Sequence, residues 1–177
     1  SASDLEDERG AFEILRRGSA LLPTNDAIYE RLLGMATRAK RLDALDAHLA
    51  RMIHDAIDSA TTVVLLERRG QLLEGALDRH QDAAEVYTKL LQFRPDDDAA
   101  ASRLRKNLRR SARHQELLLV IEKQLKRDLG SARRLALLRE MAVTWEQYLR
   151  NRWEATDAWK KVLEHAPDDG EALAALT

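Results

Sequence analysis

Apolar residues along most of the chain recur at intervals of three and four positions, which is the period of an amphipathic α-helix. Good helix formers dominate the composition and β-branched residues are few. The breaks in the pattern are short, and helices joined by short connections pack antiparallel. The pattern therefore predicts an all-α fold. Its helices are expected over residues 6–21, 25–39, 42–57, 59–77, 80–93, 97–111, 114–128, 131–149, 152–165 and 168–176.

The same arrangement of residues repeats along the chain. Pro23, Pro95 and Pro167 follow one another at intervals of 72 residues. When residues 23–94 are set against residues 95–166 without gaps, the matching positions are mostly apolar or small. Such internal similarity is typical of stacked repeats. The sequence predicts one domain over residues 1–177, a fragment of a longer array, with repeat units 23–94 and 95–166 and a partial unit 167–177.

Residues with capping side chains mark several predicted helix starts. Ser59 and Ser131 stand at equivalent places in the two units and are the expected N-caps of their helices. Gly130 suits a left-handed backbone conformation just before Ser131. Polar or acidic residues also follow each of the three prolines, where a carboxylate favours the positive end of the next helix dipole.

Three segments share a small residue, a bulky residue four positions later and a proline eight positions after that: Ala11-x3-Leu15-x7-Pro23, Ala83-x3-Tyr87-x7-Pro95 and Ala155-x3-Trp159-x7-Pro167. They resemble the second helix of the tetratricopeptide repeat (TPR). Leu66-x3-Gly70-x2-Leu73 and Leu138-x2-Met141-Ala142-x2-Trp145 resemble the first helix of that repeat. The resemblance implies a right-handed α–α superhelix, a TPR-like solenoid of about ten antiparallel helices. One hairpin cannot bury its apolar face alone, so hairpins must stack.

The chain departs from the family pattern in two respects. Alternate hairpins lack the small and aromatic pair, with Leu45 and Leu117 among the residues that replace it. The unit is also longer than two repeats of about 34 residues. One extra residue is expected near Leu77 in the first unit and near Leu149 in the second.

Composition and charge exclude several kinds of protein. The formal net charge is −1, so no global field attracts nucleic acid or a membrane surface. Cysteine is absent, which excludes disulfides and thiolate metal sites. The chain shows no signal peptide and no apolar run long enough to span a bilayer, so a cytoplasmic location is the expectation and no membrane partner is expected. Arginine outnumbers lysine, as is typical of GC-rich bacterial genomes.

No pattern of residues indicates catalysis. The chain lacks a metalloprotease helix motif, a phosphate-binding glycine loop, an EF-hand loop and a nucleophile elbow. Its five histidines do not stand at metal-ligand spacing. We therefore expect no enzyme activity, cofactor, metal or small-molecule substrate. Trp145, Trp153 and Trp159 could form a stacking platform for a ligand, but Trp145 and Trp159 occupy bulky core positions, which favours a hairpin core.

Six basic residues between Arg103 and Arg113 stand without an intervening acid. In the TPR family the first helix of each hairpin lines a concave groove, and the resemblance implies that this groove is partly basic. An arginine there could hold a carboxylate bidentately. The alternative to a binding groove is a solvated helix face whose positive charge is neutralised by acids on neighbouring helices. The expected groove residues are Arg31, Arg38, Arg68, Gln71, Arg103, Lys106, Arg109, Arg110, Arg139 and Gln147, interspersed with Glu67, Glu74, Glu140 and Glu146.

These features predict a protein–protein interaction scaffold whose partner is a peptide or helix, possibly acidic, held in the groove. Two alternatives stay open, namely single-stranded RNA binding by a helical-repeat array and a regulatory or assembly domain of a larger protein. The near-zero net charge and the scarcity of aromatics make a nucleic acid partner unlikely. Glu30 and Gly34 stand where the carboxylate clamp of some TPR proteins needs Lys and Asn, which disfavours binding of a C-terminal tail.

Overall fold

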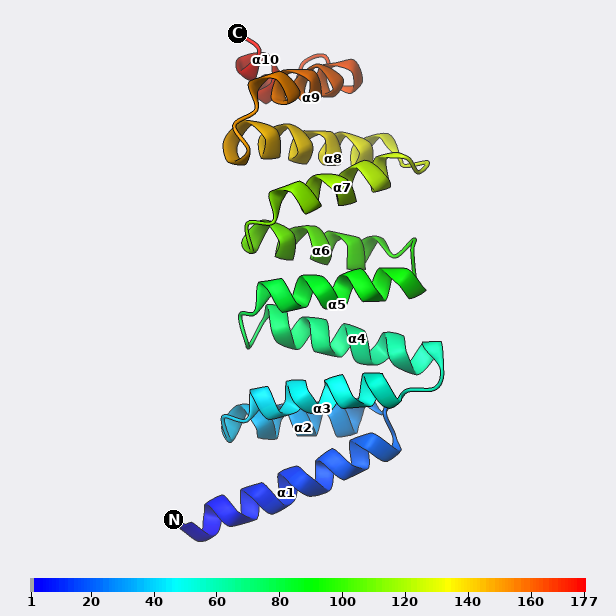
Figure 1. Cartoon of the computed structure of the whole chain (residues 1–177), viewed down its shortest axis with the longest axis vertical. Coiled ribbons are helices and arrows are strands. Elements are labelled where there is room, and N and C mark those ends of the chain that lie inside the picture. Colours follow the sequence, from blue (N-terminus) through cyan, green and yellow to red (C-terminus); the bar gives the residue numbers. More distant parts are fainter. Residues whose placement is uncertain (1) are drawn as a thin grey trace. The chain divides into compact units, whose positions relative to one another are not determined.

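The computed structural model describes residues 2–177, with side chains from residue 7 onward, and divides into two compact units, Ser1–Asn107 and Leu108–Thr177. The described residues form ten α-helices and one π-helical turn, without any strand (Figure 1). The predicted all-α class and the ten predicted helices are confirmed, while the single domain over residues 1–177 stays a prediction. The helices are α1 (Ala2–Leu21), α2 (Asp26–Arg38), α3 (Leu42–Asp55), α4 (Ser59–Glu74), α5 (His80–Phe93), α6 (Asp98–Arg110), α7 (His114–Leu125), α8 (Ser131–Val143), α9 (Arg152–His165) and α10 (Gly170–Ala175), with the π-turn η1 (Thr144–Tyr148) continuing α8.

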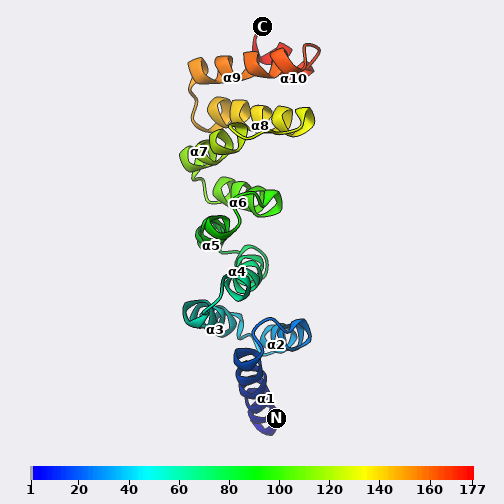
Figure 2. The ribbon, with the colours of Figure 1, turned by 90° about the vertical axis from the view of Figure 1, so that its right-hand side faces the viewer.

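In the first unit each of the helices α1 to α4 packs on the next along the chain, and the most extensive of these contacts joins α4 to α5. Figures 1 and 2 show α4 and α5 side by side. The core of this unit consists of fully buried large side chains from successive helices. They include Phe12, Leu32, Leu45, Leu49, Leu65, Leu66, Leu73, Tyr87 and Leu90.

The contact between α4 and α5 depends on the small residues of the repeat pattern. Ala83 is fully buried, and the Tyr87 ring lies directly against Gly70. A Cβ atom added at Gly70 would lie only 2.7 Å from Cζ of Tyr87, which is closer than real contacts allow. The small and bulky residues singled out in the sequence therefore do form the interior of this hairpin.

The second unit holds a hairpin of the same kind between α8 and α9. Ala142, Ala155 and Trp159 are buried there, and the indole Nε1 of Trp159 donates a hydrogen bond to Glu146 at 3.2 Å. Trp159 is thus confirmed as a core residue. Trp145 is half-buried, and Trp153 is exposed.

The helix starts after the prolines share one capping arrangement at intervals of 72 residues. Asn25, Asp97 and Asp169 each accept a hydrogen bond from the backbone N–H three residues on, at 2.9, 2.9 and 3.0 Å respectively. A side-chain oxygen at this place satisfies a backbone donor that has no partner within the helix. The prediction that capping residues follow each proline is confirmed.

The turns between helices recur at the same interval. Among the described residues, four non-glycine residues have positive φ, at 54° for Lys40, 57° for Ala112 and 51° for both Asp78 and Arg150. Lys40 and Ala112 are 72 residues apart, as are Asp78 and Arg150. This left-handed conformation costs an L-residue about 1–2 kcal/mol, so each turn must be imposed by the helices that it joins.

A wider turn ends α4 and η1 at equivalent places. The amide N–H of Leu77 bonds the carbonyl of Leu72, and that of Leu149 bonds the carbonyl of Thr144, both at 3.1 Å. Each bond spans five residues instead of the four of an α-helix. Bonds of the same span join Arg41 to Ala36 and Arg113 to Leu108, so the place of the extra residue in each unit stays a prediction.

Three of the predicted helix-end signals are wrong. Ser59 is the first residue of α4, and its N-cap is Asp58, whose carboxylate accepts from the amide of Thr61 at 2.7 Å. Ser131 likewise is the first residue of α8, preceded by Gly130 with a φ of −57°, which is not left-handed. Aspartate accepts at least as well as serine, so the earlier carboxylate caps α4. Within the described residues, no helix has the length and apolar character to cross a membrane.

Candidate functional site

The even-numbered helices, called the first helices below, carry the residues of the predicted groove. In the first unit Arg31 and Arg38 on α2, Gln71 on α4 and Lys106 on α6 are exposed. Arg31, Arg38 and Lys106 form no ion pair with any described side chain. These three cations are therefore available to an anionic partner.

Arg68 is placed differently from the expectation, because its side chain does not face solvent. It is 7 % exposed, and its guanidinium donates to the carbonyl of Pro23 at 2.6 Å, the carbonyl of Thr24 at 3.2 Å and the carboxylate of Asp26 at 2.7 Å. The same group lies 4.6 Å from the ring centroid of Tyr29, a cation–π distance. Arg68 thus ties α4 to the connection between α1 and α2. Burial raises the pKa of Tyr29 to about 12 despite the neighbouring guanidinium.

Glu74, at the end of α4, joins several polar groups of the first unit. It forms an ion pair with Arg103 and accepts a hydrogen bond from Nδ2 of Asn107 at 2.8 Å. It also lies beside the hydroxyl of Tyr87, whose pKa is raised by burial and by this carboxylate. Asn107 is fully buried and contacts Nδ1 of His80 at 2.7 Å. Arg103 is therefore already paired with an acid.

Asn107 was not among the predicted residues, although the sequence holds a signal for it. It stands three positions after Leu104 and one before Leu108, at an apolar position of the α6 pattern. A buried polar side chain at such a position requires hydrogen-bond partners. Here Glu74 and His80 provide them.

In the second unit two of the three predicted groove arginines form ion pairs with acids. Arg109 forms an ion pair with Glu140, and Arg139 forms one with Asp169, with Nε at 2.7 Å from the carboxylate. Arg110 is exposed without an ion pair to a described residue, and Gln147 is exposed on η1. A shallow hollow of about 310 Å³ lies here, lined by Arg109, Arg139, Glu140, Val143, Thr144 and Tyr148.

These ion pairs connect alternate helices. Within the first unit Arg68 links α4 to Asp26 of α2, and Arg103 links α6 to Glu74 of α4. Within the second unit the pair of Arg109 links the last turn of α6 to α8, while that of Arg139 links α8 to the N-cap of α10. The first helices of each unit therefore share a side on which arginines and carboxylates interdigitate. Each of these four arginines is therefore neutralised by a carboxylate of a neighbouring helix or its N-cap, as in the alternative interpretation of the basic residues.

A hollow of about 470 Å³ between α1 and α2, called the α1–α2 hollow, combines apolar and basic side chains. Ile14 and Leu15 come from α1, and Met35 comes from α2. Arg31 and Arg38, the two unpaired arginines of α2, stand in the same wall. The remaining lining residues are Ala11, Glu30 and Gly34. Apolar surface and free positive charge therefore meet in this hollow.

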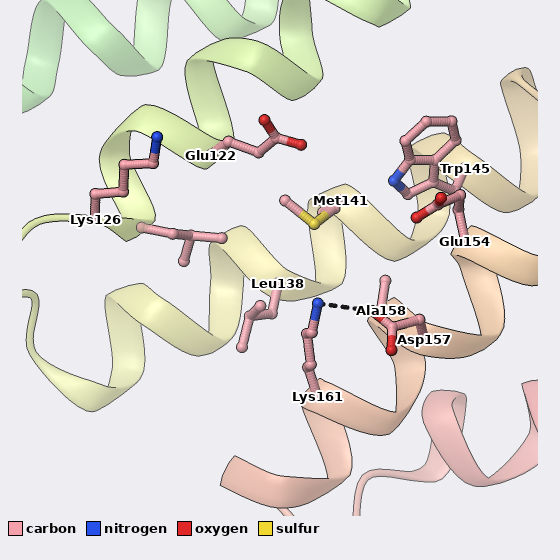
Figure 3. A pocket seen from close by; sticks show the side chains of 10 residues that line it. Glu122, Lys126, Leu138, Met141, Trp145, Glu154, Asp157, Ala158 and Lys161 are labelled. Atoms are coloured by element: carbon pink, nitrogen blue, oxygen red, sulfur yellow. Dashed lines mark ion pairs between the residues drawn. The ribbon is translucent and has the colours of Figure 1, made fainter.

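A further hollow of about 280 Å³ lies in the second unit over α8, between α7 and α9 (Figure 3). Leu138, Met141 and the half-buried Trp145 provide apolar surface. Carboxylates and lysines, hence charges of both signs, surround this surface. Lys161 pairs with Asp157 at 2.6 Å, and this hydrogen bond raises the pKa of the lysine. The mixed charges define no single ligand.

Among the described residues, no group of three or more His, Asp or Glu side chains is placed to hold a metal ion. Comparison with models of known protein families and with curated protein sequences gives no match.

Proposed function

We propose that the chain is a TPR-like repeat scaffold, a right-handed superhelix of stacked hairpins, that binds an acidic segment of a partner protein along its first helices. Two features support the repeat architecture. The caps, turns and small-residue contacts recur at intervals of 72 residues. The ion pairs also join each first helix to a neighbouring first helix within its unit, as stacked hairpins require.

The observation that carries the binding function is the unpaired charge of the first unit. Arg31, Arg38 and Lys106 are exposed without a carboxylate partner among the described residues, whereas Arg68 and Arg103 on the same set of helices are paired. Complementary charge speeds association and fixes the register of a partner. A segment with two or three carboxylates is the partner that fits this surface.

RNA binding is the less favoured alternative. Nucleic-acid surfaces are strongly positive and place aromatic side chains for stacking on bases. Here Arg103, Arg109 and Arg139 are each neutralised by an acid, and Trp159 lies in a hairpin core. A regulatory or assembly domain of a larger protein would use the same surface, with the partner segment supplied by another domain.

The double variant Arg38→Glu with Lys106→Glu tests this function. Peptides selected from a random phage-displayed library against the wild-type chain are expected to be rich in Asp and Glu. Their affinity, measured by fluorescence anisotropy, is expected to fall at least about tenfold in the double variant, since two attractions become repulsions. Added salt should weaken wild-type binding as well.

The matched control is Arg51→Glu with Lys89→Glu, which reverses two exposed charges on α3 and α5 of the same unit. This control should keep the wild-type affinity, and all variants should keep the wild-type circular dichroism. Selected peptides without acidic enrichment, or peptides that bind the Arg38 and Lys106 variant equally well, would contradict the proposal. Tighter binding of single-stranded RNA than of any selected peptide would favour the alternative.

A further inference from the structure

The contacts that α4 makes with α5 and α6 are a template for how this chain can bind another helix. Near its end, α4 places Gly70 against the ring of Tyr87. One turn later Glu74 forms an ion pair with Arg103 and accepts a hydrogen bond from Asn107. The small residue allows close approach, and the carboxylate fixes the helix end. Both contacts come from one face of α4, because residues four apart lie on the same face of a helix.

The residues that α4 contacts have equivalents 72 positions earlier in the chain. Tyr87 corresponds to Leu15, Arg103 to Arg31 and Asn107 to Met35. All three equivalents line the α1–α2 hollow. The hollow is thus the counterpart of the surface that the end of α4 occupies, and within the described residues it is open.

Side-chain exposure on α1 shows an apolar side of this helix that no described helix covers. Ile14 is 72 % exposed, whereas its equivalents Val86 on α5 and Ala158 on α9 are 5 % and 2 % exposed. Helices α4 and α8 pack on α5 and α9 respectively. On another side of α1, Phe12 is buried, as is its equivalent Ala84. The open side of α1 therefore corresponds to the side of α5 that α4 covers and to the side of α9 that α8 covers.

We propose that the α1–α2 hollow binds an amphipathic helix of a partner protein in the manner of α4. The partner helix carries a small residue that packs on Leu15 and a carboxylate four residues later that pairs with Arg31. Its apolar face covers Ile14. Charge complementarity selects an acidic helix end, since Arg31 and Arg38 stand in the hollow without an ion-pair partner among the described residues. This inference shares Arg31 and Arg38 with the proposed groove, and it goes beyond the groove by adding the apolar side of α1 as the docking surface of a helix.

A peptide copy of α4 and its following turn, residues 59–77 of this chain, is a suitable probe because it carries the required face. Labelled with a fluorophore, the peptide is expected to bind the intact chain saturably in anisotropy titrations. Gly70→Leu or Glu74→Gln in the peptide is expected to lower its affinity at least about tenfold, by loss of close approach and of the ion pair respectively. Ile14→Asp in the chain should have a similar effect.

A charge swap identifies the docking place. Arg31→Glu in the chain should weaken the wild-type peptide about tenfold, and Glu74→Arg in the peptide should restore binding to that variant. The matched chain variant Arg103→Glu alters the intramolecular α4 contact and should leave peptide binding unchanged. Lys106→Glu, which affects the proposed groove, should also leave it unchanged, so the two proposals can fail separately.

Three outcomes would overturn the inference. The first is absence of saturable binding to a chain whose circular dichroism is native. The second is binding that responds to Arg103→Glu but not to Arg31→Glu, which would show exchange with the intramolecular α4. The third is concentration-dependent self-association of the unmodified chain in sedimentation that Ile14→Asp abolishes, because a second copy would then be the occupant of the hollow.

Discussion

The Ala83→Arg variant is expected to lose about 4 kcal/mol of unfolding free energy, or to fail to fold. Ala83 is fully buried in the hairpin of α4 and α5, the most extensive helix contact in the first unit. An arginine there forces the two helices apart and buries a charge without a partner, and both effects are strongly destabilising. Urea unfolding followed by circular dichroism measures the loss.

Ala47→Arg is the matched control, because Ala47 lies exposed on α3 of the same unit. It introduces the same side chain into a helix without burying it, so its effect should stay within about 0.5 kcal/mol. If both variants unfolded at the same urea concentration, the small residue at position 83 would not be what holds the hairpin together.

The second large effect is expected for Arg68→Ala, which should cost about 3 kcal/mol of stability. The guanidinium supplies hydrogen bonds to two backbone carbonyls and to the carboxylate of Asp26, and its stem packs against Tyr29. Its removal leaves acceptors without their donor and opens a cavity under α2. Thermal and urea unfolding report the change.

Two further variants separate this structural role from a role in binding. Arg68→Lys should recover only part of the stability, because an ammonium cannot reproduce the fork of donors. Arg31→Ala, which removes an exposed arginine without an ion-pair partner among the described residues, should change stability by less than about 0.5 kcal/mol. A loss in Arg31→Ala as large as in Arg68→Ala would contradict the distinction between buried and available arginines.

The helices could be predicted from the sequence because their signals are local. The apolar period fixes each helix, and the residues after Pro23, Pro95 and Pro167 cap the next one. The small residues at Gly70 and Ala83 also revealed which faces touch, since only a tight contact requires them. The N-cap at Asp58 was missed because a serine beside it satisfies the same sequence rule.

The candidate site was harder to predict, because the state of a charged side chain depends on the helix opposite to it. Arg31 and Arg103 are equivalent in the repeat, yet Arg103 meets Glu74 and Arg31 meets no acid among the described residues. Arg68 lies on the expected helix, but its long side chain reaches the carbonyls of Pro23 and Thr24. Neither outcome follows from residue type or helical period alone.

Small-angle X-ray scattering of the chain in solution tests the central claim, that the hairpins stack in an open array whose first helices remain accessible. A compact globule of 177 residues would have a radius of gyration of about 16 Å. An open array predicts a clearly larger radius and a pair-distance distribution with a long tail. A monomer with the globular radius and a symmetric distribution would contradict the stacked architecture, and the proposed groove with it.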